Sequence, residues 1–153
     1  MLVLRGLEGK LSLEIPNVLF TGIFRSRDED FTYFASKKLH GRKLLRNEFL
    51  MLDPQTTAMN ADIIAQFLWQ LHAERTILPV KRRDHCLLHG DFSLDHLLFG
   101  PDNIVCGVLD FGDSRVGKPM SDFVYLLDDD DQEEFGAAFG NMVLDRYRSV
   151  AGR

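Results

Sequence analysis

Three side chains in one short stretch of this chain could together perform proton transfer and bind a metal ion: Asp91, His96 and Asp110. A carboxylate can orient an attacking hydroxyl group and take its proton, and this part fits Asp91. Mg²⁺ prefers oxygen ligands, so Asp110 is the stronger candidate ligand and His96 the weaker one. Metal-dependent hydrolysis is a second chemistry open to the same residues, although such sites usually have more protein ligands.

A tight hairpin is expected to bring these side chains together. Residues 97–99 and 104–109 form two apolar runs of strand type, and the segment 100–103, Gly-Pro-Asp-Asn, is rich in turn-forming residues. An antiparallel pair would place His96, just before the first strand, close to Asp110, just after the second. Polar groups therefore converge at the open end of the hairpin.

The chain before the hairpin begins with strands and a crossover. Residues 1–8 have the apolar spacing of the tail of a helix. Residues 18–24 and 31–39 are rich in β-forming residues and flank a charged turn, which indicates a second antiparallel pair. Residues 42–52 are expected to cross over into a second layer.

Helices are expected on both sides of the hairpin in sequence. Asp53 followed by proline is a helix-start signal, and apolar residues recur at helical spacing from there to about His72. The basic segment 76–84 is expected to be an exposed loop, and residues 120–127 begin another helix. A last helix is expected to bury the apolar set Phe135, Phe139, Met142, Val143 and Tyr147.

Composition excludes several classes of protein. The chain has 153 residues, enough for one domain with a real core, and its net charge of −5 argues against a general nucleic-acid binder. Cys86 and Cys106 lie in apolar runs, where thiols behave as small hydrophobic side chains, so a disulfide framework is not expected. No signal peptide or run of eighteen apolar residues is present, so we expect a cytoplasmic protein without membrane contact.

Three stretches of the sequence carry a resemblance to a known family. They read H-G-D-F-S-L-D-H-L-L-F, G-V-L-D-F-G-D-S and S-D-F-V-Y-L-L-D-D-D-D. The first has the spacing of the kinase catalytic loop H-x-D-x-x-x-x-N, with histidine in place of asparagine, and the second contains the kinase D-F-G. In this order they resemble the aminoglycoside phosphotransferases, especially the subset that modifies the 2''-hydroxyl, with macrolide kinases as cousins.

The resemblance implies an α+β, protein-kinase-like fold. Residues 1–40 would form a partial N-lobe of two antiparallel strands and the hinge, and residues 41–153 a reduced helical C-lobe with the catalytic hairpin. It also implies roles: Asp91 as catalytic base, with His96 and Asp110 on Mg²⁺. The hinge residues Lys37, Lys38 and Leu39 would contact the base of ATP or GTP through their backbone.

The acidic run Asp128–Glu134 has two interpretations. Charge runs are usually solvated, and these carboxylates could lie at the N-terminus of a helix, where its dipole favours them. In the 2''-modifying enzymes, however, the corresponding region meets the amino groups of the antibiotic, so the substrate would be a small, cationic, hydroxyl-bearing molecule. The candidate substrate-binding residues are Ser93, Asp113, Asp128 and Asp131, while Asp122 resembles a family aspartate that braces the catalytic loop.

The sequence also departs from the family pattern. It contains neither a G-x-G-x-x-G run nor a V-A-I-K-like strand with its phosphate-binding lysine, and only thirteen residues separate His72 from Cys86, where the family usually has several dozen. We therefore expect a chain that is reduced at both ends. A second hypothesis follows, in which the chain is a binding protein or an inactive remnant. An exposed edge of the N-lobe strands would also allow a homo-oligomer.

Overall fold

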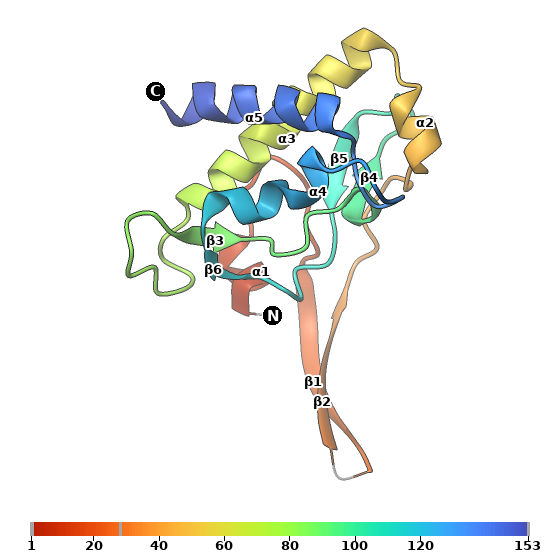
Figure 1. Ribbon diagram of the computed structural model, residues 1–153. Helices are drawn as coiled ribbons and strands as arrows, with labels where there is room; N and C mark the ends of the chain where they lie inside the picture. Colours follow the sequence, from red (N-terminus) through yellow and green to blue (C-terminus); the bar gives the residue numbers. More distant parts are fainter. Residues whose placement is uncertain (1, 28, 153) are drawn as a thin grey trace.

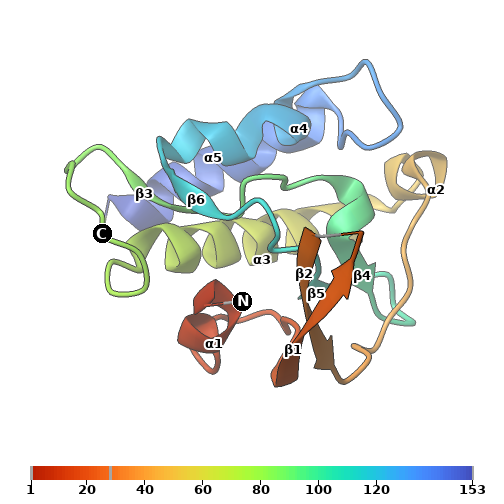
Figure 2. The ribbon, with the colours of Figure 1, turned by 90° about the horizontal axis from the view of Figure 1, so that it is seen from below.

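The long helix α3 (Pro54–Ala73) is the element around which the others pack in this computed structural model, which describes residues 2–27 and 29–152. Asp53 caps it by accepting hydrogen bonds from the amides of Gln55 and Thr56, both at 3.0 Å, and Pro54 occupies its first turn. The helix predicted from Asp53 to about His72 is therefore confirmed. Figure 2 shows α4 and α5 on one side of α3 and α1 on the other.

Helices and strands are interspersed along the chain (Figure 1). They are α1 (Leu2–Leu7), β1 (Val18–Ser26), β2 (Glu29–Ser36), α2 (Arg46–Leu50), α3, β3 (Cys86–Leu88), the 3₁₀ helix η1 (Leu94–His96), β4 (Leu97–Phe99), β5 (Val105–Val108), β6 (Arg115–Gly117), the 3₁₀ helix η2 (Pro119–Phe123), α4 (Val124–Leu127) and α5 (Ala137–Ala151).

The described strands form three separate antiparallel pairs rather than one sheet: β1 with β2, β3 with β6, and β4 with β5. The β4–β5 pair is the hairpin predicted at residues 97–109, with Leu97 opposite Val108. Its turn uses Asn103 at a positive φ of 58°, a conformation that asparagine tolerates better than most residues. The hairpin prediction is confirmed.

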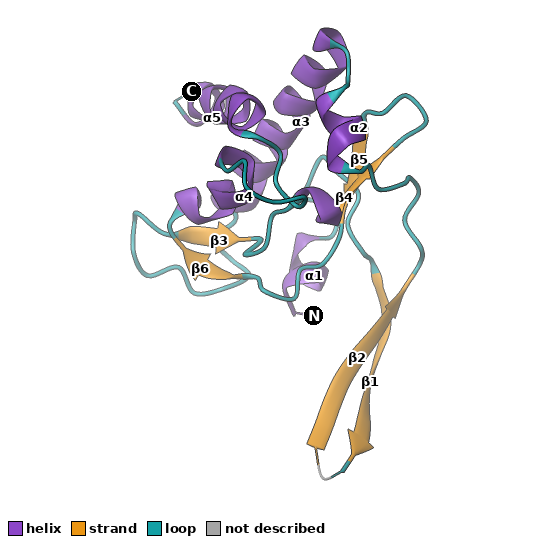
Figure 3. Cartoon of the chain, turned by 45° about the vertical axis from the view of Figure 1, so that its right-hand side comes forward, coloured by secondary structure: helices purple, strands orange, loops and turns teal. Residues whose placement is uncertain are grey.

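The β1–β2 pair projects away from the helices as a two-stranded hairpin, which we call the arm (Figures 1 and 3). The antiparallel pairing was predicted, but its bounds were not. Both strands reach further towards the tip than expected, because Arg25 and Asp30 form a cross-strand ion pair at 2.7 Å instead of lying in a loop. The second strand ends at Ser36, so residues 37–39 have no strand partner within the described chain.

The C-terminal third differs from the prediction at its acidic run. Residues 120–127 begin with the 3₁₀ helix η2 before the short helix α4, and the run that follows is a loop. Because α5 begins only at Ala137, the carboxylates of Asp128–Glu134 do not lie in the first turn of a helix, and that interpretation is wrong. Phe135 is fully buried as predicted, but it precedes the helix.

Aromatic side chains fill the core between the helices and the hairpin. Phe92 is 1% exposed and stacks between Phe67 of α3, at 5.8 Å, and Phe135, at 6.2 Å between ring centroids. Phe135 in turn packs on Phe139 of α5. Phe92 thereby anchors the residue next to Asp91 in the core. None of the helices in the described ranges has the length and apolar character needed to cross a membrane.

Candidate active site

Asp91, His96 and Asp110 meet at the open end of the β4–β5 hairpin. The Nδ1 atom of His96 is 3.7 Å from Oδ2 of Asp91, and its Nε2 atom is 3.7 Å from Oδ2 of Asp110. The hairpin causes this proximity, because the amide of Leu109 donates to the carbonyl of His96 at 2.8 Å. The two ends of the hairpin are thus joined directly beside the two side chains, as the sequence predicted.

Hydrogen bonding determines which ring nitrogen of His96 carries the proton. Its Nδ1 atom lies 2.8 Å from the backbone carbonyl oxygen of Asp91, which can only accept, so Nδ1 carries the proton. In the neutral ring, Nε2 is then left with a free lone pair on the side of Asp110. An imidazole held in this way by a carbonyl group is a typical metal ligand.

Asp110 is the most exposed of the three and has a strained backbone. Its side chain is 62% exposed, against 32% for Asp91 and 18% for His96. Its φ angle of 53° is uncommon for a residue other than glycine, and its Oδ1 atom accepts from the amide of Gly112 at 3.1 Å. Such backbone strain concentrates at functional sites, where it aims a side chain at a ligand.

These residues fit a magnesium ion that is shared with a phosphate ligand, but not a closed metal cage. In the described part of the chain, no group of three or more His, Cys, Asp or Glu side chains is arranged to hold a metal ion. Mg²⁺ usually keeps several waters and binds one or two carboxylates together with the phosphates of a substrate. The pair His96 and Asp110 suits that mode, whereas a hydrolytic metal centre would need further protein ligands.

His89 joins residues 89–96, which we call the catalytic loop after the motif that they match, to the end of the hairpin. Its side chain is fully buried, and its Nε2 atom donates to the carbonyl of Leu109 at 2.8 Å. Its Nδ1 atom accepts from the amide of Asp91 at 3.4 Å. Burial lowers the pKa of His89, which keeps the ring neutral and suits one donor and one acceptor. His89 is an architectural residue that fixes the separation of Asp91 and Asp110.

Asp122 supports the catalytic loop through buried hydrogen bonds, the role implied by its resemblance to a family aspartate. It is 1% exposed, and its carboxylate accepts from the amides of His89 and Gly90, each at 2.9 Å, and from Nε2 of His72 at 3.0 Å. The Nδ1 atom of His72 accepts from the hydroxyl of Tyr147 at 2.9 Å, and burial raises the pKa of Tyr147 to about 12. Residues from α3, η2 and α5 thus hold one loop. From the sequence, His72 and Tyr147 were predicted only to lie in helices, without a role in this network.

Gly90 is required by the shape of this loop. Its φ is 96°, and a Cβ atom at this position would overlap the carbonyl oxygen of Asp113. Replacing Gly90 by alanine is therefore expected to lower the free energy of unfolding by about 2–4 kcal/mol, measured by urea denaturation. Gly9 is the matched control, because its φ of 72° is also positive but its Cβ would face open space. Gly9→Ala should cost only about 1–2 kcal/mol, and equal costs for the two variants would contradict the close approach.

The acidic loop between α4 and α5 is fastened to the catalytic loop. The amide of Leu94 donates to the carbonyl of Glu133 at 2.9 Å, and the amide of Phe135 donates to the carbonyl of Tyr125 at 3.0 Å. Arg46 adds an ion pair to Asp129 at 3.1 Å. The loop is therefore held beside the site, and Asp128 and Asp131 are exposed on it.

Tyr125 is a site residue that the sequence did not single out. The carboxylate of Asp91, hydrogen-bonded to its hydroxyl, raises the pKa of Tyr125, and Glu133 and Asp131 act in the same direction. Asp91 and the acidic loop thus share one electronegative region. The sequence gives one signal that could have pointed to Tyr125: it lies three residues after Asp122 in a short predicted helix.

The other predicted substrate-binding residues lie on different sides of the loop. Ser93 is 1% exposed, and its hydroxyl is 3.2 Å from Nδ1 of His96, so it lies behind the histidine. Asp113 is exposed, and its carbonyl accepts from Arg115, which also donates to the carbonyl of Gly90 at 2.9 Å. The assignment of these residues to a substrate stays a prediction.

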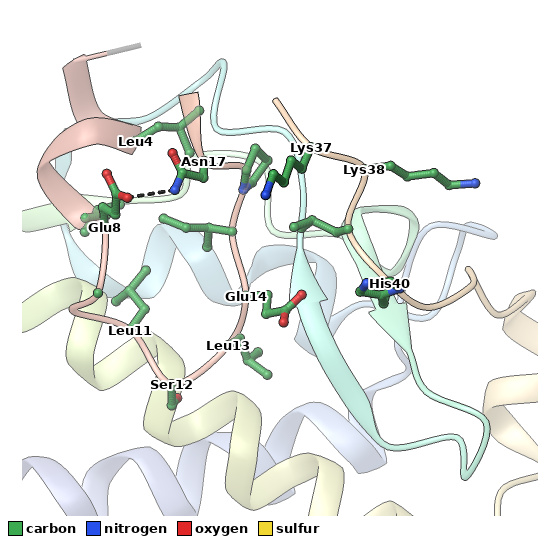
Figure 4. Close-up of a pocket in the computed structure, with 15 residues that line it drawn as sticks. Leu4, Glu8, Leu11, Ser12, Leu13, Glu14, Asn17, Lys37, Lys38 and His40 are labelled. Atoms are coloured by element: carbon green, nitrogen blue, oxygen red, sulfur yellow. Dashed lines mark hydrogen bonds between the residues drawn. The ribbon is translucent and has the colours of Figure 1, made fainter. Parts of the chain in front are cut away.

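Lys37, Lys38 and Leu39 line two neighbouring cavities. The larger, of about 460 Å³, lies between these residues and the segment 8–17, and Figure 4 shows Lys38 pointing away from it. The smaller, of about 190 Å³, is also lined by Leu98 and Leu109, which adjoin the hairpin positions of His96 and Asp110. The smaller cavity combines the backbone of residues 37–39, which has no strand partner in the described chain, with an apolar wall close to His96 and Asp110.

Comparison with known proteins identifies relatives of this chain in sequence and in fold. A family model described as the phosphotransferase enzyme family matches residues 18–153. The streptomycin–ATP ternary complex of APH(2'')-IIa has a TM-score of 0.74 and 25% identity to this chain, and the match covers 95% of this chain and 65% of that one. The macrolide 2'-phosphotransferase MphH from Brachybacterium faecium has a TM-score of 0.63 and 17% identity, and the match covers 99% of this chain and 63% of that one.

A shorter match connects the chain to a larger protein. Over 50 residues, 32% of this chain and 6% of the other protein, it is 44% identical to acyl-CoA dehydrogenase family member 11 of Rattus norvegicus. The chain spans less than two thirds of the length of each of these relatives. The structural likenesses confirm the predicted fold class, an α+β fold of the protein-kinase-like type.

Proposed function

The chain belongs to the phosphotransferase enzyme family, and on that premise we propose that it transfers the γ-phosphoryl group of ATP or GTP to a hydroxyl group of a small cationic molecule such as an aminoglycoside. The observation that carries the proposal is the contact of His96 with both Asp91 and Asp110, each at 3.7 Å. One carboxylate lies on the proton-bearing side of the ring and the other on its lone-pair side, which separates the base from the metal-binding pair.

Asp91 acts on the acceptor in this reaction. It orients the hydroxyl group and takes its proton as the oxygen bonds to the γ-phosphorus, while the bond from that phosphorus to the bridging oxygen breaks and the nucleoside diphosphate leaves. The side chain is 32% exposed, so an acceptor can reach it from solvent. The contact of its backbone carbonyl with Nδ1 of His96, at 2.8 Å, holds the loop in place around it.

Asp110 and Nε2 of His96 would hold Mg²⁺, which when bound neutralises charge on the nucleotide phosphates. The nucleotide base would lie in the smaller hinge cavity, between the backbone of residues 37–39 and the side chains of Leu98 and Leu109. Its phosphates would then lie towards the open end of the hairpin, where the acceptor hydroxyl would meet Asp91.

The acidic loop supports a cationic acceptor. Asp128 and Asp131 are exposed on a loop that is bonded to the catalytic loop through Glu133 and Leu94. Several carboxylates near one base attract a polyamine sugar and repel acceptors that are themselves anionic. In the solved relative APH(2'')-IIa, streptomycin and ATP are bound in one complex.

The experiment incubates the purified chain with Mg²⁺, ATP or GTP, and a panel of aminoglycosides and macrolides, and detects phosphorylated acceptor by mass spectrometry. The proposal expects product with a cationic acceptor, and none when nucleotide or Mg²⁺ is omitted. Absence of product with every acceptor and both nucleotides would contradict it.

The second candidate function is binding without turnover. It is favoured by the absence from these 153 residues of a glycine-rich phosphate loop and of its lysine partner. In kinases these groups position the γ-phosphate, and a misplacement of about 1 Å can cost about 10²-fold in rate. Nucleotide binding in calorimetry, together with no phosphorylated product, would favour this candidate over the first.

Replacing Asp110 by asparagine is expected to weaken nucleotide binding by at least about tenfold when Mg²⁺ is present, because one ligand of the metal–phosphate unit is lost. Without Mg²⁺ the affinities of the wild type and Asp110→Asn should be equal. Titration calorimetry with ATP and GTP measures both conditions. An Asp110→Asn variant that binds Mg²⁺-nucleotide as tightly as the wild type would remove Asp110 from the metal site.

A further inference from the structure

The strained backbone of Asp110 has to be held in place by the residues around it. Its φ of 53° lies in the left-handed region, and such conformations persist only where the surrounding contacts determine them. In this conformation Oδ2 of Asp110 lies 3.7 Å from Nε2 of His96. Contacts on both sides of Asp110 must therefore prevent its relaxation to ordinary backbone angles.

The residue before Asp110 is held by two hydrogen bonds. The amide of Leu109 donates to the carbonyl of His96 at 2.8 Å, and the carbonyl of Leu109 accepts from Nε2 of His89, also at 2.8 Å. The ring of Phe111 adds an edge-on contact with the ring of His89, with 4.7 Å between the centroids. The segment that leads into Asp110 is thus fixed to the hairpin and to the catalytic loop.

Arg115 supplies the corresponding contact on the other side of Asp110. Its Nη1 atom donates to the carbonyl of Asp113 at 3.1 Å and to the carbonyl of Gly90 at 2.9 Å. The guanidinium group therefore bridges the segment that follows Asp110 to the catalytic loop. The sheet register positions this side chain, because Arg115 of β6 pairs with Leu88, the last residue of β3 before the catalytic loop.

The two carbonyl groups that Arg115 bridges lie where two chain segments approach closely. A Cβ atom at Gly90 would overlap both the carbonyl oxygen of Asp113 and Nη1 of Arg115. Carbonyl oxygens only accept hydrogen bonds, so two of them that converge need a donor between them. A charged guanidinium group makes stronger hydrogen bonds than a neutral donor. The bridge is therefore a restraint on the segment that carries Asp110.

We propose that Arg115 is a positioning residue of this site: by joining Asp113 to Gly90, it keeps the carboxylate of Asp110 facing Nε2 of His96. The role of that pair in holding Mg²⁺ rests on the proposed function, whereas the restraint by Arg115 does not. Arg115 acts through Asp110 and contacts neither nucleotide nor acceptor. Its side chain is exposed and lies outside the hydrophobic core, so its removal opens no cavity.

The first test measures the restraint without any ligand. In backbone ¹⁵N NMR relaxation, the order parameters of residues 110–113 should be about 0.85 in the wild type and should fall to about 0.6 in Arg115→Ala. Lys118→Ala is the matched control, because it removes an exposed side chain of the same charge three residues further along the chain. This control should keep the wild-type order parameters, and both variants should keep the wild-type thermal unfolding.

Order parameters that are unchanged in Arg115→Ala would overturn the proposal, whether or not the chain binds nucleotide. Guanidinium chloride at millimolar concentration provides a further check, because the free ion has the same planar set of donors and can occupy the place of the lost side chain. It should restore the order parameters of Arg115→Ala and leave those of the wild type unchanged. A loss of order that guanidinium does not reverse would also contradict the bridge.

The second test separates positioning of Asp110 from direct contact with the nucleotide. In calorimetry with ATP and Mg²⁺, Arg115→Ala should bind about tenfold more weakly than the wild type, as is usual when a metal ligand loses its support. Without Mg²⁺ the two affinities should agree within about twofold, because an exposed charge is screened by salt. An equal loss of affinity with and without Mg²⁺ would mean that Arg115 contacts the phosphates itself, which would overturn the proposal.

The two tests also distinguish this proposal from the proposed function. A wild type without affinity for Mg²⁺-nucleotide would contradict the proposed function, while a reversible loss of order in Arg115→Ala would still support the restraint of Asp110. Conversely, a wild type that binds Mg²⁺-nucleotide, together with an Arg115→Ala variant that matches it in both tests, would remove Arg115 from the site and leave the proposed function intact.

Discussion

Replacing Asp91 by asparagine is expected to lower the rate of phosphate transfer by about 10²–10⁴-fold, the usual contribution of a general base. Asparagine keeps the size of the side chain but cannot accept the proton of the acceptor hydroxyl. The backbone carbonyl of Asp91 holds His96 at 2.8 Å and is unaffected by the substitution, so the metal-binding pair stays in place. Nucleotide affinity should therefore change little, and the loss should fall on the rate constant measured at saturating nucleotide and acceptor.

Asp95→Asn is the matched control for this prediction. Asp95 lies four residues further along the same loop, in η1, and its side chain is exposed. Its substitution makes the same change in net charge and should leave the transfer rate within about twofold of the wild type. Equal losses of transfer rate in both variants would show that the rate depends on the net charge of the loop and not on a base at Asp91.

Replacing Asp122 by alanine is expected to lower the free energy of unfolding by about 3–5 kcal/mol. The carboxylate is 1% exposed and accepts from two backbone amides and from His72, and alanine leaves all three donors unsatisfied in the core. Small domains are stable by only about 5–15 kcal/mol, so much of the margin would be lost. Urea denaturation followed by far-UV circular dichroism measures the change.

Tyr147→Phe isolates the outer part of the same network. It removes only the hydrogen bond from the tyrosine hydroxyl to His72, at 2.9 Å, and keeps the ring packed against Phe123. Its cost should be about 1 kcal/mol. If Asp122→Ala were no less stable than Tyr147→Phe, the carboxylate would not be the brace of the catalytic loop.

The hairpin and the convergence of Asp91, His96 and Asp110 could be predicted because they depend on local signals. The segment 100–103 has turn residues with apolar runs on both sides, and an antiparallel pair then places its flanking residues together whatever the rest of the chain does. The helix that begins after Asp53 was predictable for the same reason, since its cap and its apolar periodicity both depend on residues that are close together in the sequence.

The brace around Asp122 could not be predicted in full, because it joins residues far apart in the chain. His72 and Asp122 are 50 positions apart, and His72 and Tyr147 are 75 positions apart. Periodicity assigns each residue to a helix face but does not show which faces meet. The resemblance supplied Asp122 alone, and the packing of α3 against α5 supplied its partners.

The acidic run shows the opposite failure, in which a local signal was outweighed by tertiary contacts. Carboxylates before an apolar period favour a helix N-terminus, yet the segment stays a loop because Phe135 is drawn into the core beside Phe92. Its backbone bonds to Tyr125 and Leu94 replace those of a helical turn. The division into residues 1–40 and 41–153 stays a prediction.

The fate of the γ-phosphate tests the central claim most directly. The chain is incubated with Mg²⁺ and γ-labelled nucleotide in molar amounts close to its own, with and without a cationic acceptor, and the label is followed to its product. Asp91 and the pair of His96 and Asp110 predict that the label appears on the acceptor, and that it stays on the nucleotide when no acceptor is present. Release of the label as inorganic phosphate at the same rate with and without acceptor would contradict a phosphotransferase site.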